Sequence, residues 1–275
     1  MRTGGWWAKV VVTALAVAGW LSGPLGGPAR SEVYVEIYSG LVHGMANSEY
    51  SSFPRLETGY HVQIAIKGYY EPHVQGGLKL GTWFVREGAL GFNYPGFLKH
   101  FGFFLDFSYH RLNYMRSQRD VYIADASNSF PVGTARLYFH SEGAAACLAF
   151  MFAGRLGYAK SPDFPYGRLQ PYLALGPALL FTSQHPKLDF VWGLLGKVGY
   201  HPNSDSTVAP ALAVETGLRY LALKNVSLDF SFKYRFARPS YHFNFRDPAT
   251  GFRHSFTLRP SYHLLSGQIG VAYHF

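Results

Sequence analysis

The chain is poor in several features that mark other classes of protein. A single cysteine, Cys147, excludes a framework of intrachain disulfides. After residue 25, no apolar run is long enough for a spanning helix, which needs ~20 residues. Charged residues make up only 15% of the sequence and form no long basic run, although the formal net charge is +9. The charge balance alone could suggest nucleic acid, but no basic cluster supports that reading.

Aromatic residues, by contrast, are abundant at 17%, and the chain has 30 glycines. Its final segment alternates to the last residue, with mostly apolar side chains at the odd positions from Leu265 and small or polar ones between them. A period of two is typical of a half-buried strand. The ending with Tyr273 and Phe275 resembles the assembly signal of bacterial outer-membrane barrels, which implies recognition by the barrel-assembly machinery.

Residues 1–29 are expected to form a secretory signal peptide. A positive start at Arg2 is followed by an apolar stretch from Trp6 to Leu25 and by a small-residue cleavage site that ends at Ala29. The alternative is a retained membrane anchor, which the short run ending in Gly and Pro disfavours. Cleavage would leave residues 30–275, which show no internal repeat or linker and are expected to form one domain.

Eight segments alternate with a period of two, and most are as long as the ~9–11 residues of a tilted membrane-spanning strand. They are residues 33–41, 76–84, 101–110, 140–153, 169–181, 209–221, 226–236 and 261–275. An even number of strands is the rule in single-chain bacterial barrels. The predicted fold is therefore all-β, an eight-stranded antiparallel transmembrane β-barrel in which the first strand pairs with the last.

The connections between these segments alternate between shorter and longer. The longer ones are expected outside the cell, as in known barrels. Residues 61–67 are expected to form a strand-like arm, either within the first long connection or continuing the second strand. The connection from Thr182 to Val208 holds an apolar cluster, which predicts contact with a partner or the membrane. The open alternative is that this loop folds on itself or extends the fifth and sixth strands. The contact candidates are Phe190, Trp192, Leu194 and Leu195.

Several of these segments, in this order, resemble the OmpA-type small outer-membrane β-barrel family. The resemblance rests on residues 76–84, 102–109, 170–177, 215–220 and 225–235, together with the ending Gly270–Phe275. It covers nearly all of the chain after the signal peptide. The family implies an eight-stranded barrel and no single activity, and the apolar stretch from Phe190 to Tyr200 departs from a plain polar loop.

Charged residues recur on the faces that the alternation turns inward. An eight-stranded barrel has an interior just wide enough for side chains, so charges there must pair. Either they form a structural network that fills the barrel, or they gate a narrow pore for small solutes. The set comprises Glu36, Lys79, Asp106, Glu215, Arg219, Asp229, Lys233 and Arg235.

The turn between the sixth and seventh strands predicts a register for two of these pairs. A three-residue loop ending in Asn225, with that residue in the left-handed conformation, places inward residues opposite one another. The resulting neighbours are opposite charges, Glu215 with Lys233 and Arg219 with Asp229. Shifting the pairing of these two strands by two residues would leave neither charged residue opposite its partner.

Motifs for catalysis or metal binding are weak. His140, Ser141 and Glu142 are consecutive, so a strand turns Ser141 away from the other two. Ser261 and His263 share a face, but their order is reversed relative to the His-x-Ser-Asn pattern of barrel lipid A deacylases. The twelve histidines are scattered, and residues 193–198 lack the setting of a phosphate loop. No catalytic, metal or cofactor site is predicted.

These observations together predict a non-enzymatic outer-membrane barrel whose structural or binding role lies in its extracellular loops. A narrow solute pore and a lipid A- or phospholipid-modifying enzyme are the alternatives. The expected partners are outer-membrane lipid and lipopolysaccharide and the barrel-assembly machinery; nucleic acid is not expected. The sequence does not name an external ligand.

Overall fold

A computed structural model describes the chain from residue 32 onward, with gaps. The described residues are 32–45, 49–53, 61–66, 70–84, 95–124, 131–192, 196–246, 251 and 253–275. The expected signal peptide, residues 1–29, lies outside them. No helix among the described residues is long and apolar enough to cross a membrane.

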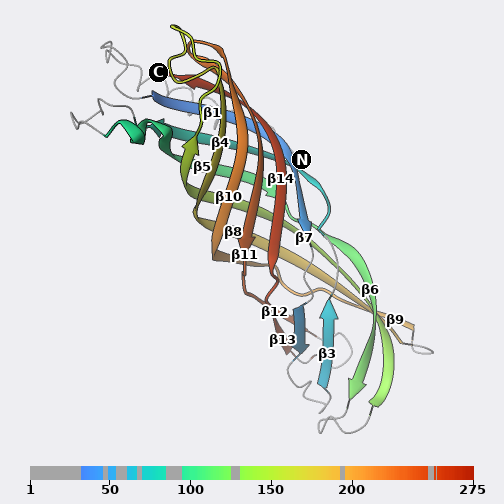
Figure 1. Ribbon diagram of the computed structural model, residues 1–275. Helices are drawn as coiled ribbons and strands as arrows, with labels where there is room; N and C mark the ends of the chain where they lie inside the picture. The colour runs from blue at the N-terminus through green and yellow to red at the C-terminus, as the bar shows by residue number, and fades with distance from the viewer. Residues whose placement is uncertain are drawn as a thin grey trace.

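Eight long strands form a closed antiparallel barrel, as the alternating segments predict. Around the barrel the order is β1-β4-β5-β7-β8-β10-β11-β14, and β14 pairs with β1 to close it (Figure 1). The predicted pairing of the first strand with the last is thereby confirmed. The barrel strands are β1 (Glu32–Met45), β4 (His73–Trp83), β5 (Phe101–Arg111), β7 (Pro131–Arg155), β8 (Leu169–Trp192), β10 (Asp205–Leu223), β11 (Val226–Ala237) and β14 (Tyr262–His274).

The barrel strands alternate between an exposed apolar face and a buried face. In β11, Phe230 and Phe232 are 49% and 50% exposed, whereas Ser231 between them is fully buried. The same pattern leaves large apolar side chains exposed around the whole wall. They include Ile37, Leu41, Phe107, Phe150, Leu175, Leu179, Leu212, Leu218, Ile269 and Val271. An apolar outer surface with a polar interior is the reverse of a soluble barrel.

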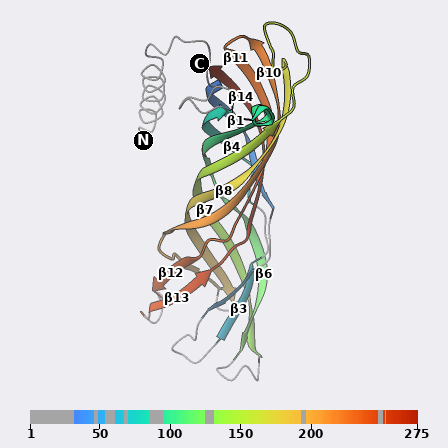
Figure 2. The same ribbon diagram turned by 60° about the vertical axis from the view of Figure 1, so that its left-hand side comes forward.

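The two ends of the barrel differ (Figures 1 and 2). At one end lie the C-terminus, the 3-10 helix η1 (Gly96–His100) and a two-residue turn between β10 and β11. At the other end, β7 and β8 continue far beyond the ~9–11 residues needed to span a membrane, with 25 and 24 residues. This end carries all the remaining strands.

These remaining strands build what we call the extension. They are β2 (Glu49–Phe53), β3 (His61–Ile66), β6 (Tyr114–Ala124), β9 (Gly196–Tyr200), β12 (Tyr241–Arg246) and β13 (Arg253–Leu258). β6 pairs with the start of β7, β9 pairs with the end of β8, and β12 and β13 form a separate hairpin. Residues 61–66 of the expected arm form β3, which pairs with β2 and β6, so this strand lies within the first long connection and does not continue β4.

The register between β10 and β11 is the predicted one, but the turn differs from the prediction. Glu215 lies opposite Lys233, and Arg219 lies opposite Asp229. The turn has two residues, Lys224 and Asn225, and the irregularity between Leu221 and Leu223 supplies the third. A β-bulge of this kind inserts one unpaired residue into a strand. The left-handed conformation expected for Asn225 is wrong, because Ala159 alone has a positive φ among the described non-glycine residues.

Candidate functional site

The eight predicted interior charges all lie inside the barrel and are no more than 2% exposed. Strands β1, β4, β5, β10 and β11 supply them, at alternate positions that face the barrel axis. Four are anionic and four are cationic, so the set carries no net charge when all are ionised. The anions are Glu36, Asp106, Glu215 and Asp229; the cations are Lys79, Arg219, Lys233 and Arg235.

The opposite wall leaves room for these long side chains. The inward residues of β7 and β8 are mostly small and fully buried: Ala145, Cys147, Ala149, Ala153, Ala174 and Ala178. Glycine has the same role beside the aromatic rings, since a Cβ on Gly217 would lie 2.6 Å from the ring of Tyr172. An eight-stranded barrel has only enough interior for side chains. Long residues on one wall therefore require short ones on the other.

Lys79 is the centre of the network. Its ammonium donates to Glu36 Oε1 at 2.8 Å and to Glu215 Oε1 at 2.7 Å, and it lies 3.8 Å from Asp229 Oδ1. Each bond joins groups that are about 1% exposed. A buried ammonium is stable only when its charge and donors are satisfied, and this one has three carboxylates around it.

Both predicted cross-strand pairs form. Arg219 Nε donates to Asp229 Oδ2 at 3.2 Å, and Lys233 Nζ lies 3.1 Å from Glu215 Oε2. Lys233 also donates to Asp106, and Arg219 reaches Glu36 across the barrel at 2.5 Å. The pairs are therefore links in one connected network, which joins strands on several sides of the barrel.

Phenols and amides that are not among the eight predicted interior residues complete the network. The Tyr172 hydroxyl contacts Glu215 at 2.7 Å and Asp229 at 2.8 Å, and the Tyr38 hydroxyl donates to Asp106 at 2.6 Å. Arg235 donates to Ser108 Oγ at 2.8 Å and to the amide of Gln75. The period-2 pattern places these residues on the inward faces, and that is the signal in the sequence that indicates them. Gln75 lies outside the predicted second strand, which begins at residue 76.

Beyond the charges, an aromatic cluster fills the mouth of the barrel on the side of the extension. The Tyr241 hydroxyl donates to Thr182 Oγ1 at 2.5 Å and shares a hydrogen bond of 2.8 Å with Tyr262. Tyr70 packs edge-on against Tyr114 and Tyr262, at centroid distances of 5.3 and 5.2 Å. The buried members are Tyr70, Leu112, Tyr114, Phe139, Leu188, Tyr241, Phe243, Phe256 and Tyr262. Side chains therefore fill the barrel interior at two levels along its axis, the charge network and this aromatic cluster.

The prediction of an exposed apolar cluster in the third long connection is wrong for Phe190. This side chain is 9% exposed, and its ring packs edge-on against Tyr200 at 5.5 Å. The reason is that β8 continues through residue 192 and pairs with β9, which is the alternative of a loop that folds on itself or extends the fifth strand. The side chain of Trp192 and the residues Leu194 and Leu195 lie outside the described part of the structure.

The consecutive residues His140, Ser141 and Glu142 point to opposite faces of β7 in turn, as the period-2 pattern predicts. Ser141 is buried and donates to Gln184 Oε1 at 2.5 Å, whereas His140 and Glu142 lie on the outside, 3.6 Å apart. Lys187 donates to Glu142 at 2.9 Å and holds the pKa of that carboxyl below its ordinary value. His263 bonds the Tyr234 hydroxyl at 2.7 Å. Among the described residues, no group of three or more His, Cys, Asp or Glu could hold a metal ion.

The residues of the expected assembly signal lie at the end of β14. Tyr273 is 51% exposed on the outer wall, and its ring packs edge-on against Phe275 at 5.1 Å. The Phe275 backbone N–H donates to the Val33 carbonyl at 2.9 Å, which fixes this end to β1.

A closed sheet with an apolar belt outside and a filled polar interior satisfies its backbone without water, as only helices and closed barrels can do in lipid. The chain is an integral outer-membrane β-barrel. In such barrels, short connections generally face the periplasm and long ones face outward.

No protein-family model matches the chain, and no curated protein sequence matches it. Among solved structures, it is similar to a major outer membrane protein from Thermus thermophilus, with 12% identity, a TM-score of 0.45, and coverage of 89% of this chain and 99% of that chain. It is also similar to the outer membrane protein OprG from Pseudomonas aeruginosa, with 13% identity, a TM-score of 0.41, and coverage of 88% and 95%. These sequence identities and TM-scores are too low to indicate what the chain does.

Proposed function

We propose that the protein is a closed, non-catalytic outer-membrane barrel that holds a rigid structure outside the membrane for contact with partners. The observation that carries this proposal is the balanced interior network of four anions and four cations, none more than 2% exposed. A lumen filled in this way leaves no path for solutes. The specific work of the protein then falls to its external part.

The extension supports the second half of the proposal. Strands β6 and β9 pair with β7 and β8, and β3 pairs with β6. The separate β12–β13 hairpin contributes Tyr241, Phe243 and Phe256 to the buried aromatic core, so the extension continues the barrel. The β12–β13 hairpin is tied to its neighbours through side-chain oxygens: the backbone N–H of His242 donates to Asp205 at 2.7 Å and that of Asn244 to Asn203 at 2.5 Å. A rigid external surface is suited to binding, because little ordering entropy is lost on contact.

Labelling of intact cells tests the external placement. Asn244, in the extension, and Lys224, in the short turn at the opposite end, are both exposed, and the native Cys147 is buried. In separate Asn244→Cys and Lys224→Cys variants, a membrane-impermeant maleimide should label only the first on whole cells and both after lysis. Labelling of Lys224→Cys alone on whole cells would contradict the proposed orientation.

A narrow pore gated by the interior charges is the main alternative. Opening it would require several of the buried ion pairs to separate at once. Swelling of liposomes in small sugars distinguishes the two functions, since a closed barrel gives the rate of protein-free liposomes. Swelling that rises with the amount of folded protein would favour the pore.

A lipid-modifying enzyme is the other alternative, and the described side chains offer it little support. Ser141 lies inside the barrel while His140 and Glu142 lie outside, so these three residues cannot act together. Mass spectrometry of lipid A from cells with and without the protein decides the question. Identical lipid A species support a non-catalytic barrel, and a new or missing acyl chain would overturn it.

The resemblance to the OmpA-type family and the assembly role of Tyr273 and Phe275 are part of the same proposal. Eight strands and closure of β14 on β1 support the resemblance. The exposed aromatic ring of Tyr273, on the outer wall beside Phe275, supports recognition by the assembly machinery.

A further inference from the structure

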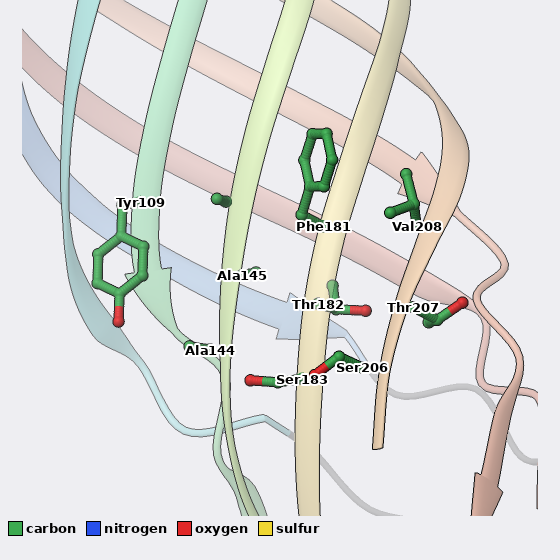
Figure 3. Close-up of a pocket in the computed structure, with 10 residues that line it drawn as sticks. Tyr109, Ala144, Ala145, Phe181, Thr182, Ser183, Ser206, Thr207 and Val208 are labelled. Carbon is green, nitrogen blue, oxygen red and sulfur yellow. The ribbon is translucent and has the colours of Figure 1, made fainter. Parts of the chain in front are cut away.

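A groove of about 360 Å³ crosses the outside of the barrel wall on β5, β7, β8 and β10. Figure 3 shows that Tyr109 and Phe181 stand on either side of β7, and that Val208 projects from β10. The residues between them are small: Ala144, Ala146, Ser183 and Ser206. The groove is therefore bounded by apolar side chains and has a floor of alanine and serine.

The register of the strands explains why the wall is hollow here. Tyr109, Ala146, Phe181 and Val208 are direct neighbours on consecutive strands and face outward together. The alanine is the one short side chain in this row, so it leaves a gap between two aromatic rings. A gap of this kind in a lipid-facing wall exposes apolar surface that one hydrocarbon chain can cover.

The groove lies where the outer wall changes from apolar to polar. One row nearer the periplasm, the outward residues are all apolar: Phe107, Leu148, Leu179 and Pro210. One row further outward they are Arg111, Ala144, Ser183 and Ser206. This change places the groove at the outer boundary of the membrane, continuous with the surface that lipid already covers.

A cation lies at the polar end of the groove. Arg111 is exposed and sits directly opposite Ala144, a residue of the groove floor. Among the ion pairs of the described residues, none includes Arg111, whereas Lys187 on the same outer wall is paired with Glu142 at 2.9 Å. An exposed guanidinium without a carboxylate partner is suited to bind a phosphate with two parallel hydrogen bonds.

We propose that this groove binds a phosphorylated lipid of the outer leaflet, with one acyl chain between Tyr109 and Phe181 and the phosphate on Arg111. The hydrocarbon chain would fill the gap above Ala146, and the hydroxyls of Ser183 and Ser206 lie at the level of the lipid head group. The proposal goes beyond the function proposed above and does not depend on it, because a pore or an enzyme could hold the same lipid.

The test is a titration of the folded protein in detergent micelles with lipid A, with bound lipid counted by native mass spectrometry. Ala146→Phe fills the groove, and Arg111→Gln removes the cation. Thr216→Phe adds the same ring to the exposed face of β10 outside the groove, and Arg259→Gln removes an exposed arginine next to β14, across the barrel. Heat-modifiable gel migration confirms that each variant is folded before it is titrated.

The expected result is a loss of about tenfold or more in lipid A affinity for Ala146→Phe and for Arg111→Gln, since a charge-assisted hydrogen bond is worth at least one such factor. The wild-type protein should bind dephosphorylated lipid A about as weakly as Arg111→Gln binds the intact lipid. Thr216→Phe and Arg259→Gln should bind like wild type. Unchanged affinity in Ala146→Phe, or equal losses in Arg111→Gln and Arg259→Gln, would overturn the proposal.

Discussion

The interior network predicts a large and non-additive response when its central cation is removed. Lys79→Met deletes the ammonium that donates to Glu36 at 2.8 Å and to Glu215 at 2.7 Å, and it leaves four buried anions with three cations. Breaking a buried pair by removing one partner costs about 3–5 kcal/mol. Methionine retains most of the volume, so the loss reflects the charge and not a cavity.

The same structure predicts partial rescue. Glu215→Gln alone leaves an excess cation and should also cost about 3–5 kcal/mol. In the double variant three anions face three cations, and Lys233 still contacts Asp106. The double variant should therefore be more stable than the sum of the single losses predicts, by about 1–3 kcal/mol.

Urea unfolding of the protein refolded into lipid vesicles measures all three free energies. Lys187→Met is the matched control, because its bond to Glu142 is as short, at 2.9 Å, but the two side chains are 43% and 55% exposed. This exposed pair should contribute at most about 1 kcal/mol. Strictly additive losses for Lys79 and Glu215, or a Lys187 effect as large as that of Lys79, would refute the reasoning.

Three further perturbations probe other parts of the molecule. Phe230→Arg on the lipid face should cost about 2–4 kcal/mol in the same urea assay if the residue lies near the bilayer midplane. Ser231→Arg adds an unpaired cation inside the barrel and should cost more. Equal losses of stability in the two variants would mean that the lipid-facing and inward faces are misassigned. Burial raises the pKa of Tyr241 from 10 to about 12, so its contribution to stability should be present below pH 10 and disappear as the pH rises through 12, and Tyr241→Phe should flatten that decline in an alkaline unfolding series. Phe275→Ala should reduce the amount of heat-modifiable barrel in the outer membrane of cells while the purified chain still refolds; unchanged assembly in cells would exclude a signalling role for this residue.

The barrel could be predicted from the sequence because lipid imposes a simple rule on it. Each spanning strand has one apolar face, so a period of two finds all eight strands, and the short turn between β10 and β11 limits their register. The charges then select one register, since Glu215 meets Lys233 and Arg219 meets Asp229 in that one only. The prediction of a left-handed Asn225 is wrong because the turn has two residues, and the third residue of the expected loop is replaced by a β-bulge in β10.

The strands of the extension are harder to predict from the sequence, because strands outside the lipid need no continuous apolar face. β6 presents charged and polar residues at many positions, so its pairing with β7 follows from proximity and not from an apolar pattern. Tyr241, Phe243 and Phe245 do alternate, and this signal of β12 could have been read as a strand. An apolar residue beyond the membrane predicts an exposed contact, but Phe190 is buried because β8 continues and pairs with β9.

The central claim is that the side chains close the barrel, and single-channel recording in planar bilayers tests it most directly. Folded protein, verified by its heat-modifiable migration before insertion, should give no discrete current steps, because the balanced interior network and the aromatic cluster of the outer mouth both fill the lumen. Reproducible unitary conductance that scales with the amount of folded protein would contradict the account and would assign the interior charges to a gate.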